Sequence, residues 1–479
     1  MTYNIKDKSM HTPDFLSGSG DVICVISTAP GMGAIAVIRL SGKGSITLTD
    51  KVFKSPSGKK LSEAKANSIH FGRIYQENEI LDEVLVSVFH APQSFTGEES
   101  VEISCHGSVY IQQKIMETLI ANGARLAQAG EFTRRAFGNG KFDLSQAEAV
   151  ADLIASSSKA SHRIAMNQMR GGFAEKLREL RDKLLQFVSL IELELDFSEE
   201  DVEFANREQL YELTTEIEAE IDKLANSFQL GNAIKNGIPV AIIGETNAGK
   251  STLLNLLLNE EKAIVSDIHG TTRDVVEDTV NIGGVTFRFI DTAGIRHTTD
   301  TIEAMGIERS FQKIEQANVV LWMIDLTTDI EKVKSLSKII LPKLAHKHVV
   351  LIFNKSDLVS EEHISQKKNL FPELDAERVF ISAKQQHNTA RLQQILLDAA
   401  HLPQIGENDV VVTNLRHYES LTNALESIRR VKEGLDTGIT SDFVSQDIRE
   451  CMYYLGEITG QISTDEVLGN IFSKFCIGK

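Results

Sequence analysis

The sequence contains little that would place the chain in a membrane or in an oxidising compartment. No apolar run reaches the ~18 residues that a membrane-spanning helix needs, and residues 1–15 lack the apolar core of a signal peptide. The four cysteines are scattered without a CxxC pair, which argues against a zinc site and against a disulfide framework. We therefore expect a cytoplasmic protein that does not contact membranes.

Acidic residues outnumber basic ones, and aromatic side chains are few. The formal net charge of −17 argues against broad, charge-driven binding of nucleic acid, because the average surface would repel phosphates. Aromatic residues make up 6% of the chain, too few to favour a platform on which bases stack. Any contact with RNA is therefore expected to be local or shared with a partner protein.

The length and the pattern along the chain predict several domains. At 479 residues, a prior of roughly 150 residues per domain gives about three. Short β-rich runs cover about 21–102, and helical spacing follows from 111 to about 223, with Asp143 and Ser145 as candidate N-caps. Strand–helix alternation then runs from Ile238 to about His401, and the tail is helical again. This order predicts a helical domain split by an inserted α/β domain.

The predicted boundaries follow from these changes of pattern. They give a variable extension (1–20), an N-terminal α+β domain (21–140), the first half of the helical domain (141–235), the inserted α/β domain (236–401) and the second helical half (402–479).

A phosphate-binding loop opens the inserted domain. Residues 244–251 read GETNAGKS, directly after the apolar strand VAIIG and before the helix TLLNLLL. Gly244 and Gly249 let the backbone N–H groups wrap around phosphates at a helix N-terminus. Lys250 places an ammonium between the β and γ phosphates, and the Ser251 hydroxyl can bind Mg²⁺. Because the loop lies between a predicted strand and a predicted helix, a chance match to the phosphate-loop pattern is much less common.

Three further elements follow in the order that a guanine-nucleotide domain requires. The segment 291–294 (DTAG) can hold Mg²⁺ through water and sense the γ-phosphate, and 270–274 (GTTRD) supplies a switch threonine. In 354–357 (NKSD), the Asp357 carboxylate accepts the two N–H donors of guanine, and 382–384 (SAK) completes the base pocket. NKSD alone could be a surface turn. Together and in order, the elements predict a Ras-like P-loop GTPase domain.

The residues expected to contact GTP come from all four motifs. They are Asn247, Ala248, Gly249, Lys250, Ser251, Thr252, Thr271, Thr272, Asp291, Thr292, Ala293, Gly294, Asn354, Lys355, Asp357, Ser382 and Ala383.

The hydrolytic step needs a group that the common Ras-type pattern does not supply here. The position just after DTAG, where a glutamine would orient water, is Ile295. Asn247 could ligate a monovalent cation that offsets the transition-state charge. Glu303 could position the water, although the residues alone favour a solvated acidic side chain at that position.

Three separate segments resemble the MnmE (TrmE) family. They are 94–107 (SFTGEESVEISCHG), 131–154 (EFTRRAFGNGKFDLSQAEAVADLI) and the terminal CIGK at 476–479, which follows GNIFSKF. With the GTPase motifs, the resemblance covers essentially the whole chain from about Asp21.

The resemblance implies a tRNA-modifying function. Members of this family form a homodimer through the N-terminal domain and bind a 5-formyltetrahydrofolate-type folate there. With the FAD- and NADH-using partner MnmG (GidA), in a heterotetramer, they modify C5 of the wobble uridine of certain tRNAs with aminomethyl or carboxymethylaminomethyl groups. Their GTPase domains approach each other when GTP and potassium are bound.

The resemblance also implies roles for individual residues. Potassium would be bound by Asn247, by the carbonyls of Ser266 and Ile268, and by Thr271; Mg²⁺ would be bound by Ser251 and Thr272, and Glu303 would orient water. Folate would be bound by Arg39, Glu102, Lys141 and Lys479, which the residues alone present as surface charges or ion pairs. Cys476 would be the nucleophile of the modification chemistry, with a buried structural thiol as the alternative.

Two other functions use the same motifs. One is a regulatory GTPase of the ribosome-assembly kind, which the CIGK tail and the lack of a recognisable RNA-binding module disfavour. The other is a folate-dependent one-carbon enzyme in which GTP hydrolysis is regulatory. The chain also departs from some relatives at 275–277 (VVE), where they carry a second arginine, so no role for a basic residue there is inferred.

Overall fold

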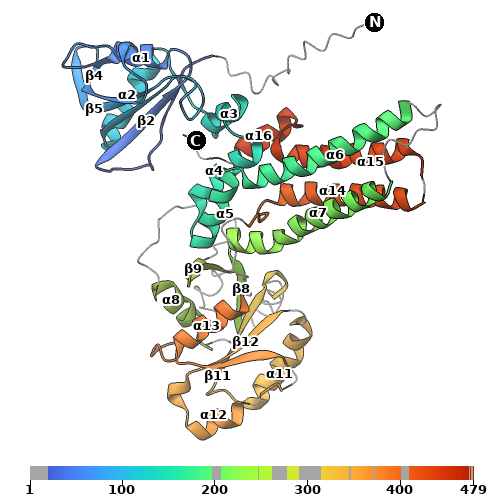
Figure 1. Ribbon diagram of the computed structural model, residues 1–479. Coiled ribbons are helices and arrows are strands. Elements are labelled where there is room, and N and C mark those ends of the chain that lie inside the picture. Colours follow the sequence, from blue (N-terminus) through green and yellow to red (C-terminus); the bar gives the residue numbers. More distant parts are fainter. Residues whose placement is uncertain are drawn as a thin grey trace. The chain divides into compact units, whose positions relative to one another are not determined.

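Figure 1 shows the computed structural model of the chain. The chain divides into two compact units. It describes residues 20–196, 207–245, 247–260, 278–290, 314–344, 347–368, 370–372, 374–400, 409–437, 439–473, 475 and 478. The first unit comprises Met1–Ile154, Met166–Ile221 and Ser420–Lys479, and the second comprises Ala155–Ala165 and Asp222–Glu419. Each unit is described separately below.

The first unit begins with a seven-stranded sheet in the order β3-β4-β5-β6-β2-β1-β7. Its strands are β1 (Ile23–Ile26), β2 (Ile35–Ser41), β3 (Phe53–Lys54), β4 (Ser68–Gln76), β5 (Glu79–Phe89), β6 (Ser100–His106) and β7 (Arg125–Leu126). Helices α1 (Ser45–Val52) and α2 (Val109–Ala121) pack their apolar side chains against this sheet, and a short 3₁₀ turn, Leu61–Glu63, follows β3. The result is the predicted α+β domain.

Alternation of side chains explains why this sheet has one apolar core. In β5, Val84, Val86 and Val88 are buried, whereas Leu85 between them is exposed on the other face. Successive side chains of a strand point to opposite faces, so this pattern places a single face against α1 and α2. Helix α1 itself was not apparent from the sequence, because its segment SITLTDKV is rich in β-branched residues that favour strands.

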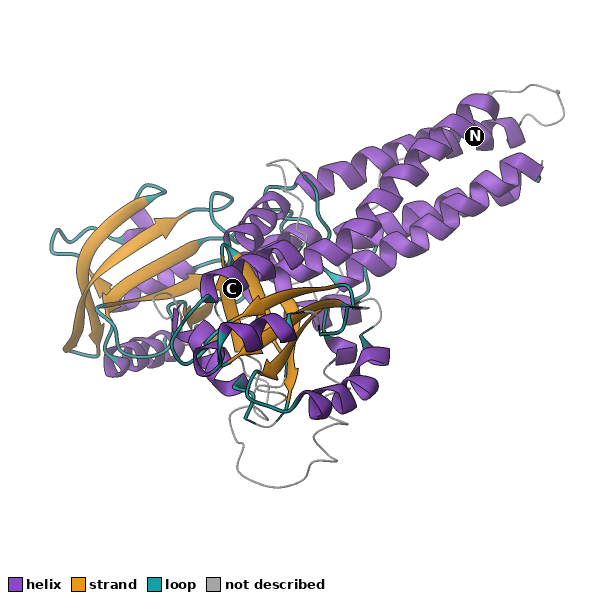
Figure 2. Cartoon of the chain, turned by 90° about the horizontal axis from the view of Figure 1, so that it is seen from below, coloured by secondary structure: helices purple, strands orange, loops and turns teal. Residues whose placement is uncertain are grey.

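The helical part of the first unit contains the tail predicted to be helical. Its elements are α3 (Glu131–Gly138), α4 (Leu144–Ala155), α6 (Gly172–Asp196), α7 (Arg207–Asn236), α14 (Leu415–Thr437), α15 (Ser441–Thr459) and α16 (Asp465–Ser473). Helices α4, α7 and α14 also contribute residues to the second unit. Ion pairs join neighbouring long helices: Lys183 to Glu216 between α6 and α7, and Arg430 to Asp447 between α14 and α15. The long helices α6, α7, α14 and α15, labelled in Figure 1, appear as long purple rods in Figure 2.

One of the two candidate N-caps of α4 is confirmed. The Asp143 carboxylate accepts a hydrogen bond from the Gln146 backbone N–H at 2.9 Å, as an N-cap does. Ser145 lies inside the helix, and its hydroxyl donates to the same carboxylate at 2.6 Å.

The second unit is a six-stranded sheet in the order β13-β12-β11-β8-β10-β9, parallel except for the antiparallel edge pair β9–β10. Its strands are β8 (Ile238–Gly244), β9 (Asp278–Ile282), β10 (Val285–Phe289), β11 (Val319–Asp325), β12 (His348–Asn354) and β13 (Ala376–Phe380). Its helical elements are α5 (Lys159–Met169, partly in this unit), α8 (Lys250–Glu260), α11 (Ile330–Ile340), α12 (Glu361–Lys367), α13 (Thr389–Ala399) and the 3₁₀ turns Leu341–Lys343 and Ser356–Leu358.

Both faces of this sheet are covered, as expected for a parallel α/β sheet. Val240 and Ile242 of β8 belong to the core with α8 and α13, whereas Ala241 and Ile243 belong to the core with α11. The predicted fold class is confirmed: an N-terminal α+β domain, helical segments on both sides of the insertion, and an inserted Ras-like P-loop domain. Within the described part of the chain, no helix has both the length and the apolar character needed to cross a membrane.

Candidate nucleotide-binding site

The phosphate loop connects β8 to α8 at the carboxyl end of the parallel sheet, and two glycines shape it. Gly244 has φ +145°, and a Cβ built there would lie 2.3 Å from the Met323 carbonyl oxygen. Gly249 has φ +100°, and a Cβ there would lie 2.3 Å from the Asn354 amide nitrogen. Both positions therefore require glycine for backbone conformation and for space.

Lys250 begins α8 and turns its side chain back over the loop. Its Nζ donates to the carbonyls of Gly244 and Glu245, at 2.8 Å each. Ser251, half-buried, and Thr252, exposed, occupy the first turn of α8, where helix N–H groups favour an anion. Asn247 is exposed on the loop with φ +65°. The arrangement suits a phosphate chain lying across the loop.

Asn354 joins three of the predicted motifs through one side chain. Its amide nitrogen donates to the Ala248 carbonyl at 2.8 Å, and its amide oxygen accepts from the Ala383 backbone N–H at 3.0 Å. The side chain is 3% exposed, so both ends of the amide are used inside the protein. The phosphate loop, NKSD and SAK therefore lie together, with Asn354 between them.

The base-binding side of the site contains one partner that the sequence analysis missed. Lys355 has φ +65°, and its Nζ lies 2.5 Å from the Asp325 carboxylate. Burial alone would raise the pKa of Asp325, but the contacts with Lys355 and Thr327 outweigh burial and lower it. Asp325 is the last residue of the apolar strand β11, which ends at the same sheet edge. A carboxylate at the end of an apolar strand was the signal in the sequence that could have identified Asp325 as part of the site.

Asp357 is the exposed carboxylate of this group. It lies in the 3₁₀ turn Ser356–Leu358, and the Gln385 side-chain amide approaches it at 3.5 Å. Ser382 is buried, and its hydroxyl oxygen accepts from the Gln385 backbone N–H at 3.2 Å. Ser382 and Ala383 are thus fixed by the fold, while Asp357 faces solvent and is available to a base.

Several of the predicted site residues lie outside the described residues. They are Ser266, Ile268, Thr271, Thr272, Asp291, Thr292, Ala293, Gly294, Glu303, Cys476 and Lys479. Among the described residues, no group of three or more His, Cys, Asp and Glu side chains could hold a metal ion. Mg²⁺ in nucleotide sites usually has few protein ligands and binds substrate phosphates, so Ser251 fits such a role.

A second candidate site lies on the sheet of the first unit. Arg39 in β2 faces Glu102 in β6 across a register pair, with 2.7 Å between guanidinium and carboxylate. The guanidinium lies 5.6 Å from the centre of the Phe95 ring and 5.7 Å from that of Phe132. Arg39 and Glu102 therefore form an ion pair, as the residues alone suggest. Both side chains are partly exposed, so a ligand can reach them.

Of the two other predicted folate residues, Lys141 is described, whereas Lys479 lies outside the described residues. Lys141 donates to the Pro92 carbonyl at 3.1 Å, and Pro92 belongs to the same loop as Phe95, which covers Arg39. At the tail, a Cβ built at Gly478 would lie 3.4 Å from the Ile26 carbonyl oxygen in β1. The tail therefore approaches the sheet that carries Arg39.

The three described cysteines are poor nucleophiles. Burial raises the pKa of Cys24 and Cys105 to about 11, and that of Cys451 to about 12. Thiols with such values are almost fully protonated at neutral pH and react slowly. Cys476 lies outside the described residues, so its role in the modification chemistry stays a prediction.

Comparison with known proteins finds similarity along nearly the whole chain. Residues 22–141 match the family profile described as GTP-binding protein TrmE N-terminus, and 144–476 match the MnmE helical domain. The chain is 63% identical over 463 residues to the tRNA modification GTPase MnmE of Bacteroides fragilis (strain YCH46), covering 96% of this chain and 99% of that protein. Identity to the protein of the same name from Bacteroides thetaiotaomicron is 60%, with the same coverage.

A solved structure with a similar segment is that of a point variant of Aquifex aeolicus Era bound to GDP.AlF4−. It is 29% identical and covers 39% of this chain and 65% of its own, with a TM-score of 0.26. Because this TM-score is low, we base no argument about the fold on this structure.

Proposed function

Because this chain belongs to the MnmE family of tRNA modification GTPases, we propose that it hydrolyses GTP in the course of modifying C5 of the wobble uridine in certain tRNAs. The observation that carries the GTPase part is the Asn354 side chain, which holds the phosphate loop and the base-binding loop together. We also propose the domain boundaries predicted above. The family matches to 22–141 and 144–476 support the boundary between the N-terminal domain and the helical domain.

In this proposal the two ends of GTP, its phosphates and its base, are bound by different groups of residues. The phosphates bind to the loop N–H groups and Lys250, and Ser251, together with Thr272, binds the Mg²⁺ that neutralises phosphate charge. The exposed Asp357 carboxylate accepts the N1–H and exocyclic N–H of guanine. Lys355 remains beside Asp325 and keeps that loop in place.

Hydrolysis in this proposal depends on potassium and on Glu303. Asn247, exposed on the loop, binds potassium with the carbonyls of Ser266 and Ile268 and with Thr271. When bound, the cation supplies positive charge beside the phosphates, where an arginine finger acts in other GTPases. Glu303 orients the attacking water.

The Glu303→Ala variant tests the hydrolytic assignment. We expect it to bind GTP normally and to hydrolyse it about 10²–10⁴ times more slowly, because a positioned acid or base contributes on this scale. Glu315→Ala is the matched control, since Glu315 is an exposed glutamate beyond the DTAG segment. Wild-type turnover in the Glu303 variant, measured as phosphate release in potassium buffer, would remove Glu303 from the mechanism.

The modification chemistry is assigned to the first unit. We propose that Arg39, Glu102, Lys141 and Lys479 bind a 5-formyltetrahydrofolate-type cofactor, which supplies a one-carbon unit when bound. Glu102 fits the pterin donors, and the cations fit the glutamate tail of a folate. Cys476 is the proposed nucleophile. The working assembly is a homodimer with the FAD-dependent partner MnmG in a heterotetramer, acting on tRNA in the cytoplasm.

A further inference from the structure

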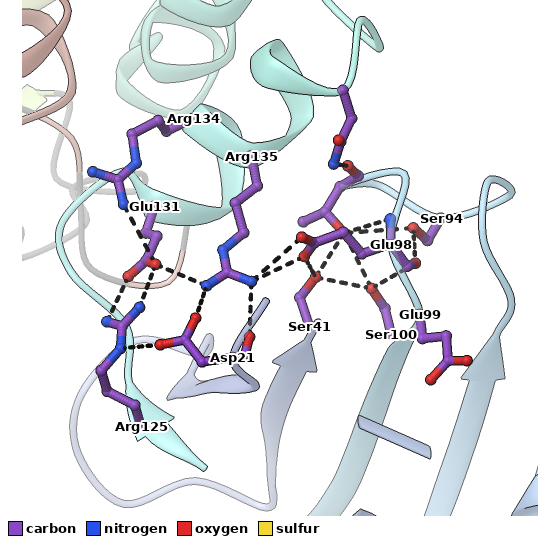
Figure 3. Close-up of polar contacts among 12 residues, drawn as sticks. Asp21, Ser41, Ser94, Glu98, Glu99, Ser100, Arg125, Glu131, Arg134 and Arg135 are labelled. Atoms are coloured by element: carbon purple, nitrogen blue, oxygen red, sulfur yellow. Dashed lines mark hydrogen bonds and ion pairs between the residues drawn. The ribbon is translucent and has the colours of Figure 1, made fainter. Parts of the chain in front are cut away.

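Helix α3 in the first unit is held on one side by a partly buried cluster of charges (Figure 3). The cluster contains three carboxylates and three guanidinium groups and therefore has no net charge: Asp21, Glu98, Glu131, Arg125, Arg134 and Arg135. The cluster joins α3 to the strand segments before β1 and β6 and to β7 itself.

Glu131 and Arg135 of α3 are at the centre of this charge cluster, 1% and 3% exposed. Arg135 lies 2.8 Å from the Asp21 carboxylate, 3.1 Å from that of Glu98 and 3.0 Å from that of Glu131. The Glu131 carboxylate also binds Arg125 at 2.7 Å. Glu131 and Arg135 are buried, and each contacts several charged partners on neighbouring segments. These contacts fix the orientation of α3 on the sheet.

On its other side, α3 contacts the C-terminal segment. Gly130, the residue before the helix, has φ +66°, and a Cβ built there would lie 2.6 Å from the Phe472 carbonyl oxygen and 3.1 Å from the Phe475 Cβ. The Phe472 ring is also 6.3 Å from the Phe137 ring of α3. Phe472 and Phe475 share an apolar cluster with Leu144 of α4.

We propose that Gly130 and α3, fixed by the charge cluster, form a seat that positions the C-terminal segment for tRNA modification. Gly130 leaves the space that the Phe472 carbonyl and Phe475 occupy, and the cluster keeps that space at a constant place on the sheet. Gly478, three residues beyond Phe475, lies against β1 of the same sheet. The role in modification rests on the function proposed above; the seat itself does not.

Gly140 provides a matched control. It follows α3, has φ +68° and has nothing within 4 Å of a built Cβ. Alanine at either glycine introduces the same unfavourable backbone conformation. Only alanine at Gly130 also displaces the Phe472 backbone, so the difference between the two variants isolates the contact with the tail.

The experiment compares Gly130→Ala with Gly140→Ala in the full chain. Hydrogen exchange of the peptide covering 465–479 is measured by mass spectrometry, together with GTP turnover and C5 modification of tRNA in the presence of the partner. We expect exchange at least 10-fold faster and modification at least 10-fold lower in Gly130→Ala, with GTP turnover unchanged. Gly140→Ala should resemble the wild type in all three measurements.

Equal hydrogen exchange of the 465–479 peptide in the two variants would contradict the proposed seat. Faster exchange in Gly130→Ala with wild-type modification would confirm the contact and overturn its role in positioning. If the wild-type protein itself modifies no tRNA, the proposed function fails, while the exchange comparison still decides whether the seat exists.

Discussion

At the scale of single residues, Asn354 and Asp357 divide the work of the NKSD motif. Asn354 uses one amide N–H and one lone pair of its amide oxygen within the protein, so it stabilises the site. Asp357 is exposed, and we assign the recognition of guanine to it. The Asp357 carboxylate is the proposed group that distinguishes guanine from adenine.

The Asp357→Asn variant should change which nucleotide is bound. Two hydrogen bonds to a charged acceptor contribute about 3–6 kcal/mol, so we expect GTP affinity to fall by about 10²–10⁴-fold. Xanthosine triphosphate should bind the variant better than the wild type, because its C2 carbonyl accepts from the new amide.

Nucleotide affinities measured by competition with a fluorescent analogue check this expectation. Asp398→Asn, which changes an exposed aspartate on α13, serves as the control. An Asp357 variant that keeps the wild-type preference for GTP would show that another group reads the base.

Much of the nucleotide site could be predicted at this scale, because its motifs have fixed spacing and follow apolar strands. What the sequence could not supply were the pairings between distant residues. Asp325 and Lys355, and likewise Asn354 and Ala248, are separated by many residues and meet only because β8, β11 and β12 lie side by side. The folate positions came from the family resemblance, since a paired Arg39 and Glu102 carry no distinctive pattern.

At the scale of elements, α3 depends on charges buried among the strands. Burial alone would raise the pKa of Glu131, but contacts with Arg125, the Gln128 N–H and Arg135 hold it below the ordinary value for a glutamate. A lowered carboxyl pKa stabilises the fold above the ordinary pKa, and that stabilisation is lost as the pH falls through the lowered value.

The Glu131→Gln variant should therefore loosen α3. Removing one partner from a buried charge cluster costs about 3–5 kcal/mol, because the arginines lose their counter-charge. The opening free energy of the peptide 131–138, measured by native-state hydrogen exchange, should fall by this amount at neutral pH. The difference from the wild type should shrink at acidic pH, where the wild-type carboxylate becomes protonated.

Glu117→Gln on α2 is the control, because Glu117 forms an exposed pair with Lys114. Equal protection of α3 in wild type and Glu131→Gln at neutral pH would contradict the structural role of the charge cluster.

Most elements of the chain could be predicted from periodicity, including β8, β11 and the three tail helices. Helix α1 could not, because its local preference for strand is overridden by packing of Ile46, Leu48 and Val52 against the sheet. The order of strands in the first sheet was also beyond the sequence, since alternation shows which face is buried but not which strands are neighbours.

At the scale of the whole molecule, the two proposed chemistries belong to different compact units. The described residues of the GTP site lie in the second unit, whereas Arg39, Glu102 and the C-terminal segment lie in the first. Helices α7 and α14 each contribute residues to both units. We infer that GTP hydrolysis drives a conformational cycle and does not supply the carbon chemistry.

The net charge of −17 also bears on the whole molecule. A surface of this average charge repels tRNA, so the proposal requires a local contact or one shared with the partner. This is why the partner belongs in any functional test.

The most direct test of the proposed function is nucleoside analysis of bulk tRNA by mass spectrometry. The tRNA comes from a strain that lacks its own copy of this gene and expresses this chain together with its cognate MnmG partner. We predict that C5-substituted wobble uridines return with the wild type, and that Cys476→Ser hydrolyses GTP but restores none. Unmodified wobble uridine with the wild-type chain, despite active GTP hydrolysis and the partner present, would contradict the proposed function.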